Sequence, residues 1–336
     1  MTKILYIGNV LSKHGYNKST IETLGPLLSE EGYKVITSSS QKNSALRLLS
    51  MVVSTIRNTG SVDYVMIDTY STLNFWYAFI ISQICRVFKI KYIPILHGGM
   101  LPQRIEKNPL LSEMIFKNAY INSVPSQFLY QKVIGNRWNN IVNIPNQIEI
   151  KEYSFKKRIK FQPKILWVRS LSDIYNPTMA IDVAEKVNFI YPEIQLCMVG
   201  PENGLTIKSL SQYAHDKNLN VTFTGKLSKS EWIKLSENYD IFINTTHFDN
   251  TPVSLIEALA LGLPVVSTNV GGIPYLVKDR ETAILVDDSD VQAMADAIIE
   301  LITNPELAHK LATNGRKLVE QFDWQIIKSL WKEILK

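Results

Sequence analysis

The sequence predicts an α/β protein with two doubly wound domains, each built around a parallel sheet. Its 336 residues are enough for two domains of ordinary size. Short apolar runs alternate with stretches of helical periodicity along the chain, as in repeated β-α-β units. A charged segment at residues 149–162 divides the chain into two such series. We therefore assign residues 1–155 and 156–320 to two domains and residues 321–336 to a terminal helix.

The first half begins with a β-α-β unit. Residues 3–10 (KILYIGNV) have the apolar run of a buried strand, and a helix from about Ser19 places apolar residues on one face. Gly32 ends this helix before a strand at 33–36. The dinucleotide-binding pattern G-x-G-x-x-G is absent from this unit. The same reasoning predicts helices at 43–58, at 73–88 and from 127, and strands at 64–68, 91–96, 119–124 and 141–144.

The second half repeats this alternation. Strands are expected at 164–168, 195–199, 221–224, 241–243, 263–267 and 284–286. Helices are expected at about 178–190, 206–216, 230–237, 252–261, 290–302 and 305–320. The last segment, 324–335, is amphipathic, with Ile327, Leu330, Trp331 and Ile334 on one stripe.

Residues 240–275 carry the strongest functional signal. After the strand at 241–243 comes a polar loop, then Thr251 as a predicted N-cap and Pro252 as the first helical residue, with Gly262 ending the helix. Such a loop lies at the carboxyl edge of a parallel sheet, where these sheets bind ligands. The helix start favours a phosphate, and Glu257, farther along the helix, suits hydroxyl groups. The stretch therefore indicates a ligand that carries both phosphate and sugar hydroxyls.

A second candidate site follows the strand at 91–96. His97 ends that strand, and Gly98 and Gly99 allow a ligand to approach the backbone closely. A histidine with a purely structural role is the alternative. The position at a strand end beside two glycines favours the functional interpretation.

The region around residue 250 resembles the retaining glycosyltransferases of family 4, also called glycosyl transferases group 1. Their signature is an acidic residue, seven residues, a glutamate, and then A-x-G-x-P-V-V and a G-G loop. Asp249 and Glu257 match the two acids, although the first is usually Glu. The other matching residues are Ala260, Gly262, Pro264, Val265, Val266, Gly271 and Gly272.

The resemblance implies a GT-B fold, in which two Rossmann-like domains face a central cleft and the terminal helix crosses back onto the first domain. In such enzymes an Arg at the position of Arg169 and a nearby Lys hold the donor diphosphate; here Tyr175 lies in the region where that Lys is expected. Lys226 or Lys229 are candidates to replace the missing charge. The resemblance assigns donor binding to Arg169, Tyr175, Gly200, Lys226, Thr251, Pro252, Val253 and Glu257, catalysis to His97, Asp249 and Glu257, and the acceptor side to His14, Gly15, Gly98 and Gly99.

The implied reaction moves a sugar from a nucleotide diphosphate sugar to a hydroxyl of a glycan or a lipid-linked acceptor, as in cell-surface polysaccharide biosynthesis. No cofactor and no metal are expected, because a helix dipole and an arginine can offset the leaving-group charge. Asp288-Ser289-Asp290 has the D-x-D pattern of another glycosyltransferase fold, but its place before a helix favours capping by Ser289 or Asp290. Two alternatives stay open: a nucleotide-sugar epimerase of GT-B fold, and a non-catalytic protein that binds nucleotide sugars.

The cysteines, the apolar segments and the distribution of charge indicate where in the cell the protein acts. Cys85 and Cys197 lie in apolar segments, as expected of buried thiols in a reducing compartment. We see no signal-peptide layout and no apolar run of ~20 residues, so we expect a cytoplasmic protein. Residues 1–155 contain 16 Lys and Arg against 9 Asp and Glu, whereas residues 156–336 contain 20 against 22. This asymmetry indicates an anionic partner of the first half, such as the inner face of a membrane, or it is chance. No nucleic-acid module is recognised, so we expect no nucleic-acid partner.

Overall fold

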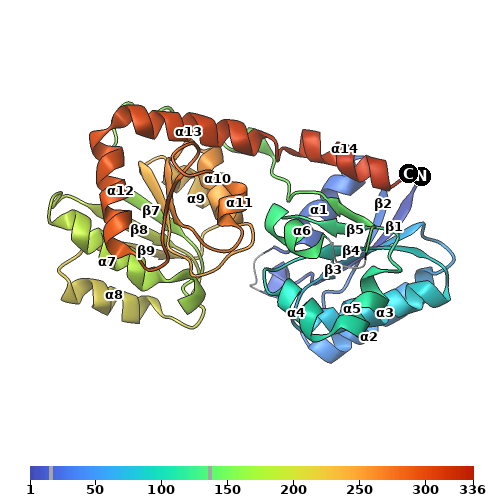
Figure 1. The fold of residues 1–336 in the computed structure, drawn as a ribbon. Coiled ribbons are helices and arrows are strands. Elements are labelled where there is room, and N and C mark those ends of the chain that lie inside the picture. The colour runs from blue at the N-terminus through green and yellow to red at the C-terminus, as the bar shows by residue number, and fades with distance from the viewer. Residues whose placement is uncertain (15–17, 135–137) are drawn as a thin grey trace. The chain divides into compact units, whose positions relative to one another are not determined.

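The computed structural model of the protein describes residues 1–14, 18–134 and 138–336. The chain forms two compact units, Met1–Gln147 with Gln325–Lys336, and Ile148–Trp324. Each unit has its own six-stranded parallel sheet with helices on both faces (Figure 1). The predicted fold class, α/β with two doubly wound sheets, is confirmed.

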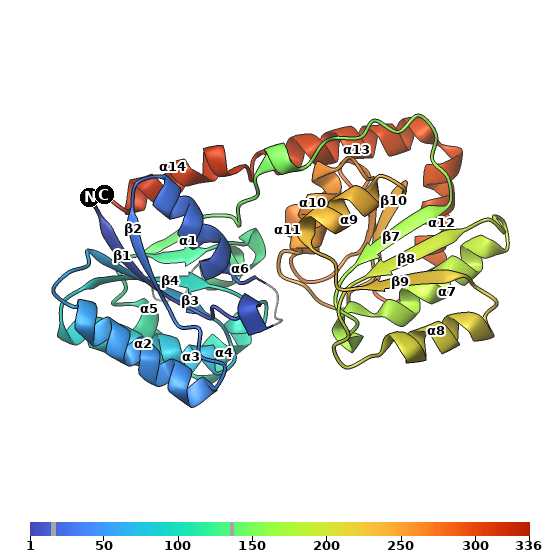
Figure 2. The same cartoon turned by 180° about the vertical axis from the view of Figure 1, so that it is seen from behind.

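The sheet of the first unit has the strand order β2-β1-β3-β4-β5-β6. Its strands are β1 (Lys3–Ile7), β2 (Lys34–Ser38), β3 (Tyr64–Thr69), β4 (Lys91–Leu96), β5 (Asn122–Val124) and β6 (Ile141–Asn143). Its helices are α1 (Thr20–Glu30), α2 (Ser44–Asn58), α3 (Asn74–Val87), α4 (Leu101–Lys107), α5 (Pro109–Phe116), α6 (Gln127–Val133) and α14 (Trp324–Ile334), most of which belongs to this unit. Helices α2, α3 and α5 cover one face of the sheet, and α1, α6 and α14 lie on the other (Figures 1 and 2).

The sheet of the second unit has the order β12-β11-β10-β7-β8-β9. Its strands are β7 (Lys164–Val168), β8 (Gln195–Val199), β9 (Val221–Gly225), β10 (Ile241–Asn244), β11 (Val265–Thr268) and β12 (Ile284–Val286). Its helices are α7 (Pro177–Asn188), α8 (Ile207–Asp216), α9 (Lys229–Ser236), α10 (Val253–Ala260), α11 (Ile273–Leu276), α12 (Val291–Thr303) and α13 (Pro305–Glu320). Two apolar cores lie on its two faces, one mainly under α7, α8 and α12 and the other mainly under α9 and α10.

The carboxyl-terminal helix α14 packs within the first unit. Lys328 and Lys332 both pair with Glu31 at the end of α1, and the Tyr64 hydroxyl donates to the Lys336 carbonyl at 2.6 Å. Trp331 and Ile334 are buried, as the amphipathic pattern predicted. These contacts show that the last residues complete the first unit, although they follow the second unit in the sequence.

The segment that joins the two units lies largely within the second one. Ile148 pairs with Asp323, and Tyr153 is buried in the second core. The unit boundary therefore follows Gln147 rather than residue 155, because these contacts hold residues 148–155 against the second sheet.

Arg158 lies in the charged segment at residues 149–162, yet it is not solvated. Its side chain is buried, and its guanidinium donates to the carbonyls of Ser236, Tyr239 and Gly262, at the ends of α9 and α10. A cation at helix carboxyl ends satisfies carbonyls that lack partners in the helix. Burial lowers the pKa of Arg158 to about 10, although the nearby Asp240 carboxylate raises it.

Candidate functional site

The carboxyl edge of the second sheet gathers several predicted donor residues around Arg169. Arg169 follows β7, and its Nη2 donates to Asp249 Oδ2 at 2.5 Å. The guanidinium carbon lies 4.8 Å from the centre of the Tyr175 ring, and Nε lies 3.5 Å from Asn244 Oδ1 at the end of β10. Tyr175 therefore supports Arg169 with its ring face. The geometry fixes the guanidinium from three sides at the edge where parallel sheets bind ligands.

The Arg169–Asp249 pair has a direct chemical consequence. Both side chains are largely buried, 13% and 15% exposed, so water screens their charges weakly. Asp249 thereby neutralises the cation that the resemblance assigns to a diphosphate. An anionic ligand at Arg169 would share it with Asp249 or displace that carboxylate.

The loop that carries Asp249 is held by glycines. Gly272 N donates to Asp249 O at 2.8 Å, and a Cβ on Gly272 would lie 1.7 Å from Asn250 O. Gly271 has φ +55°, and a Cβ there would lie 2.2 Å from Asp249 O. The G-G loop of the signature is therefore a close backbone contact that only glycine permits.

Gly200 likewise allows a close backbone contact, here with Arg169. Its φ is +153°, and a Cβ at this position would lie 1.7 Å from Arg169 O. The predicted donor residue Gly200 thus packs directly against the backbone of the predicted phosphate ligand. Its side-chain-free surface lets β7 and β8 end close together.

The helix start at α10 differs by one residue from the prediction. Pro252, not Thr251, is the N-cap, since its carbonyl accepts from both Leu255 N and Ile256 N. Thr251 lies one residue earlier and Val253 begins the helix with 44% of its surface exposed. Because proline has no capping side chain, the first N–H groups of α10 face no side-chain cap.

Ser254, in the first turn of α10, was not singled out from the sequence. Its side chain is nearly buried, yet within the described part of the chain its hydroxyl has no hydrogen-bond partner. Buried hydroxyls are normally paired, so an unpaired one at a helix start is a candidate phosphate contact. A serine two residues after a proline N-cap was the available sequence signal.

Glu257 lies in the second turn of α10 and is paired with a tyrosine from the joining segment. The Tyr153 hydroxyl donates to Glu257 Oε1 at 2.5 Å. Desolvation raises the pKa of Glu257, while the Tyr153 hydrogen bond and the charges of Lys229 and Arg169 oppose that rise. Burial, followed by the Glu257 charge, raises the pKa of Tyr153. Tyr153 was missed because its neighbours in the sequence form a charged linker.

Lys229 brings a second cation to this region. Its Nζ lies 2.7 Å from Glu152 Oε2 and 4.8 Å from the centre of the Tyr153 ring. It is therefore placed near Glu257, although it has its own acidic partner. Lys226, the residue chosen for the donor site, follows β9 at the same carboxyl edge and is exposed.

In the first unit, His97 is buried and paired with an aspartate. His97 Nε2 lies 3.0 Å from Asp68 Oδ1, which also accepts from the Tyr6 hydroxyl at 2.9 Å. The Tyr70 ring stacks on the imidazole, with 4.9 Å between centres. Asp68 and His97 end the neighbouring strands β3 and β4, so the pair stands at the carboxyl edge of the first sheet.

Asp68 was also missed as a functional candidate. It is the one acid in the otherwise uncharged run Tyr64–Thr69, at a strand end, and that was the signal. Its other oxygen, Oδ2, is buried without a partner among the described residues, and a Cβ on Gly8 would approach it to 2.6 Å. Gly8 therefore leaves room for this carboxylate beside His97.

The remaining acceptor-side residues lie around the same edge. Gly98 has φ +82°, a conformation that suits glycine, and Gly98 and Gly99 lead from His97 into α4. His14 is exposed, and its Nε2 lies 3.1 Å from the Ser40 carbonyl just after β2. Gly15 lies outside the described residues.

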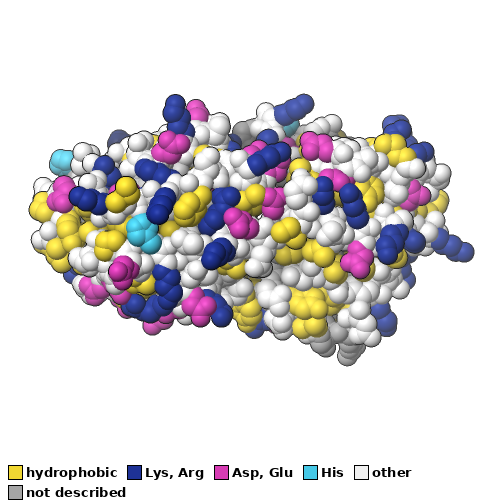
Figure 3. Space-filling model, turned by 90° about the horizontal axis from the view of Figure 1, so that it is seen from above, with side chains coloured by type: hydrophobic (Ala, Val, Ile, Leu, Met, Phe, Trp, Pro, Cys, Tyr) yellow, Lys and Arg dark blue, Asp and Glu magenta, His cyan; other side chains and the backbone are white. Residues whose placement is uncertain are grey.

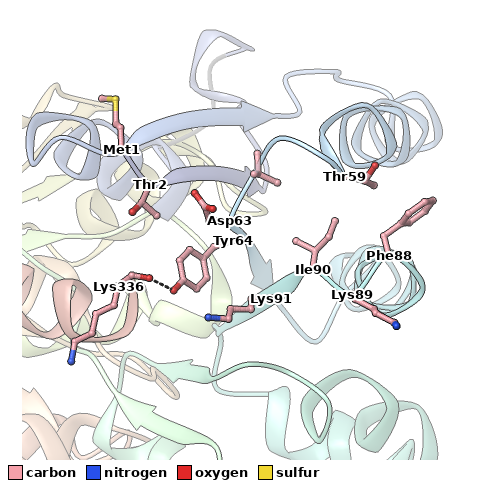
Figure 4. Close-up of a pocket in the computed structure, with 11 residues that line it drawn as sticks. Met1, Thr2, Thr59, Asp63, Tyr64, Phe88, Lys89, Ile90, Lys91 and Lys336 are labelled. Carbon is pink, nitrogen blue, oxygen red and sulfur yellow. Dashed lines mark hydrogen bonds between the residues drawn. The ribbon is translucent and has the colours of Figure 1, made fainter.

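A pocket of about 540 Å³ in the first unit lies at the opposite edge of the sheet (Figure 4). Asp63, Tyr64 and Lys91 line it where β3 and β4 begin, whereas His97 follows the other end of β4. It is therefore separate from the His97 site. Among the residues that the structure describes, no cluster of three or more His, Cys, Asp or Glu side chains is arranged to hold a metal ion.

The D-x-D sequence and the two cysteines have the structural roles expected of them. Asp290 caps α12 by accepting from Ala293 N at 2.8 Å, as predicted for this D-x-D sequence, and Asp288 pairs with His247. Cys85 and Cys197 are both free and buried, as predicted, and burial raises the pKa of Cys85 to about 12.

Within the described residues, no helix combines the length and hydropathy needed to span a membrane.

Much of the chain matches a known protein family. The family model described as glycosyl transferases group 1 matches residues 149–318, just over half of the chain. The chain belongs to this family. The match covers the whole Arg169–Asp249–Glu257 region, so the resemblance to glycosyl transferases group 1 is confirmed.

Relatives in this family cover different parts of the chain. A 2-deoxystreptamine N-acetyl-D-glucosaminyltransferase of Niallia circulans is 26% identical over 263 residues, 76% of this chain and 63% of the relative. The capsular polysaccharide biosynthesis glycosyltransferase CapM of Staphylococcus aureus is 35% identical over 112 residues, 32% of this chain and 30% of CapM. The chain thus spans less than two thirds of the length of either relative.

The structural comparison extends over both units. HepE of Anabaena, solved in complex with UDP-glucose, superposes with a TM-score of 0.79 at 18% identity, covering 100% of this chain and 99% of HepE. Such a likeness shows the fold. The protein has the GT-B fold of glycosyltransferases, as predicted.

Proposed function

We propose that this family member is a retaining glycosyltransferase that moves a sugar from a nucleotide diphosphate sugar to a glycan or lipid-linked hydroxyl. The observation that carries the proposal is the Arg169 cluster at the carboxyl edge of the second sheet, beside the uncapped start of α10. A guanidinium and free helix N–H groups complement a diphosphate. The partly buried Glu257 carboxylate complements vicinal hydroxyls.

Each residue then has a distinct role in donor binding. Arg169 and the first turn of α10, including the Ser254 hydroxyl, contact the diphosphate. Glu257, oriented by Tyr153, accepts hydrogen bonds from the ribose hydroxyls. Asp249 turns from Arg169 toward the donor sugar when the diphosphate binds. It does so because the phosphate oxygens compete with the Asp249 carboxylate for the same guanidinium N–H groups.

The proposed chemistry uses no metal ion and no cofactor. As the donor bond breaks, negative charge develops on the leaving diphosphate, and the Arg169 guanidinium and the α10 dipole stabilise that charge. Lys229 is the candidate for the second cation, because it already acts electrostatically on Glu257. In a front-face substitution the leaving phosphate accepts the acceptor proton, so the chain need not supply a strong general base.

His97 is proposed to act on the reacting sugar, with Asp68 as its positioning residue. The Asp68 carboxylate lies 3.0 Å from His97 Nε2 and so fixes the orientation of the imidazole ring. Gly98 and Gly99 allow the sugar to approach the backbone. This assignment explains why a buried acid ends β3 beside His97.

A role in cell-surface polysaccharide biosynthesis, on the cytoplasmic side of the membrane, is the proposed setting. Its support is the similarity to CapM, a capsular polysaccharide biosynthesis glycosyltransferase, together with the family membership. The epimerase alternative requires additional acids and bases around the sugar, and no specific observation favours it.

The test is turnover on a panel of nucleotide diphosphate sugars with saccharide and lipid-linked acceptors. Proton NMR of the product reports the anomeric configuration, and we expect the configuration of the donor to be retained. Glu257→Ala and His97→Ala should lose turnover, which also distinguishes an enzyme from a protein that only binds the donor. An inverted product would overturn the retaining assignment, and absence of transfer with wild-type protein across the panel would overturn the enzyme assignment.

A further inference from the structure

Helix α2 of the first unit turns an apolar stripe toward solvent. Leu46, Leu49, Val53 and Ile56 are 55%, 58%, 36% and 49% exposed. Their spacings of three, four and three residues place them in one line along the helix. We call these four residues the α2 stripe. Single exposed apolar residues are common, but a continuous exposed stripe indicates an interaction surface.

The opposite face of α2 makes this arrangement unusual. Arg47, Met51 and Thr55 are the buried residues of the helix. Arg47 donates to the carbonyls of Gln41 and Lys42, and its guanidinium lies 5.8 Å from the Tyr77 ring centre. Met51, with Leu48 and Val52, packs against the core of the first unit, and Arg47 also points inward. The helix thus leaves four further apolar side chains exposed, where a surface helix ordinarily carries polar residues.

The neighbouring helix α3 extends the apolar surface. Helices α2 and α3 lie on the same face of the sheet (Figures 1 and 2), and the Tyr77 hydroxyl donates to the Ser44 carbonyl at the start of α2. Leu73 and Trp76, at the start of α3, are 61% and 41% exposed. The Arg104 guanidinium lies 5.7 Å from the Trp76 ring. Tryptophan is enriched at membrane–water interfaces, where its amphipathic ring lies at the level of the headgroups.

The charge around this surface has one dominant sign. Residues 41–105 contain seven Lys and Arg against two Asp, Asp63 and Asp68. Arg47 and Asp68 are buried, and Lys89 and Lys91 line the pocket where β3 and β4 begin. Lys42 precedes α2, and Arg57 lies near its end and is exposed. On the adjoining α4 and α5, Glu106 is exposed, and Glu113 is paired with Lys117. The surface is therefore apolar with a positive border.

We propose that the α2 stripe, with Leu73 and Trp76, docks on an anionic lipid bilayer surface. Apolar side chains that enter the headgroup region, flanked by Lys and Arg, are the recognised physical basis of such docking. A second copy of the chain fits less well. A symmetric contact would set Lys42 and Arg57 of one copy near the same cations of the other, and one helix stripe offers little of the ~800 Å² per partner that stable interfaces bury.

One further observation agrees with this assignment. Figure 3 shows a different face, on which basic, acidic and hydrophobic side chains are mixed. Helix α2 follows the carboxyl end of β2, at the sheet edge where His97 also stands. Docking through α2 would hold this edge of the first sheet near lipid headgroups, where the hydroxyl of a lipid-linked acceptor lies.

The test is co-sedimentation of the full chain with vesicles. Neutral phosphatidylcholine vesicles are compared with vesicles that contain about 30% anionic phosphatidylglycerol, at salt of about 0.02 M and about 0.5 M. We expect binding to the anionic vesicles at low salt, and loss of most of it at high salt or with neutral lipid. The variant Leu49→Gln/Val53→Gln should bind the anionic vesicles at least about tenfold more weakly than the wild type. Because both residues are exposed, the thermal midpoint should not change.

The matched control is Phe189→Gln/Ile190→Gln, which removes two exposed apolar side chains from the second unit. It should bind vesicles as the wild type does. Failure of the wild type to bind anionic vesicles, equal binding to neutral ones, or unchanged binding of the stripe variant would overturn the proposal. Light scattering gives a further check: a wild-type dimer that the stripe variant converts to a monomer would assign the stripe to a second copy instead. The proposal does not rest on glycosyl transfer, and a water-soluble acceptor should be used equally well by both variants.

Discussion

Replacing Asp249 by Asn separates two roles of the Arg169–Asp249 pair. The substitution keeps the shape of the side chain and removes its charge. In the structure, Asp249 Oδ2 and Arg169 Nη2 are 2.5 Å apart, and both side chains are about 85% buried. The carboxylate should therefore stabilise the fold and, at the same time, hold the cation that the donor diphosphate needs.

The cost in stability follows from burial. Exposed ion pairs contribute up to about 1 kcal/mol, and removing one partner of a fully buried pair costs about 3–5 kcal/mol. With exposures of 13% and 15%, we expect Asp249→Asn to lower the free energy of unfolding by about 2 kcal/mol. In a domain of this size that corresponds to a fall in Tm of about 4–8 °C.

Asp249→Asn should change nucleotide binding and sugar transfer in opposite directions. Without the competing carboxylate, Arg169 is more available, so a nucleoside diphosphate should bind Asp249→Asn as tightly as the wild type or up to about tenfold more tightly. Turnover of the sugar donor should fall by about 100-fold, because the contact to the sugar is lost. The control Arg169→Ala should weaken nucleotide binding by about 10–100-fold, the loss of a charge-assisted contact of about 1.5–3 kcal/mol.

Isothermal titration calorimetry measures the binding, and a coupled assay of nucleotide release measures turnover. If Asp249→Asn weakened nucleotide binding as much as Arg169→Ala, Asp249 would be needed to position Arg169 rather than compete for it, and the reasoning would be refuted. Unchanged turnover would refute the assignment of Asp249 to the sugar.

Three more predictions follow from other contacts. Burial raises the pKa of Glu257, so the folded protein holds that proton to higher pH than the unfolded chain and loses stability as pH rises past this range. Glu257→Gln should therefore have a Tm equal to or above that of the wild type at neutral pH. This difference in Tm should disappear when denaturation is measured below about pH 4. The same substitution should lower nucleotide affinity by about 10–100-fold. Asp68→Asn should lower kcat by about 10–100-fold with an unchanged KM for the donor and a shifted pH profile; a parallel loss of Tm without a change in the profile would mean a purely structural role. Gly272→Ala forces a methyl group against Asn250 O, so we expect a loss of more than about 2 kcal/mol in urea denaturation, and an unchanged midpoint would contradict the close contact.

The fold was largely predictable because its signals are local. An uninterrupted apolar run such as KYIPIL fixes a buried parallel strand, and β4 has the predicted bounds. Gly262 has the left-handed conformation, φ +73°, at which the α10 helix was expected to end. The start of α10 was wrong by one residue, because Thr251 and Pro252 are both plausible caps and only the carbonyl contacts decide between them.

The candidate site was predictable only where a motif names its members. Asp249, Glu257 and Arg169 belong to a family pattern. Arg169 donates to Asp249 and its charge acts on Glu257, which agrees with a shared site. Tyr153 belongs to no such pattern and comes from a segment 104 residues away from Glu257. Long-range pairing of this kind depends on how the joining segment folds back on the second unit.

Two other features show the limit of composition. Arg158 sits in a run of three basic residues that resembles a solvated linker, yet it is buried against helix ends. In α2, both faces are apolar, so periodicity alone could not tell which side meets the sheet. In both cases a side chain's environment is set by residues distant in the sequence.

The most direct test of the donor site is a thermal-shift experiment with UDP, GDP, ADP and their common sugar conjugates, in the presence and absence of EDTA. A ligand at about 100 times its Kd should stabilise the folded protein by about 2.7 kcal/mol. We predict that one nucleotide raises the Tm of the wild type, that the rise survives EDTA, and that Arg169→Ala removes most of it. No rise with any nucleotide, or an equal rise in Arg169→Ala, would contradict a donor site at the carboxyl edge of the second sheet.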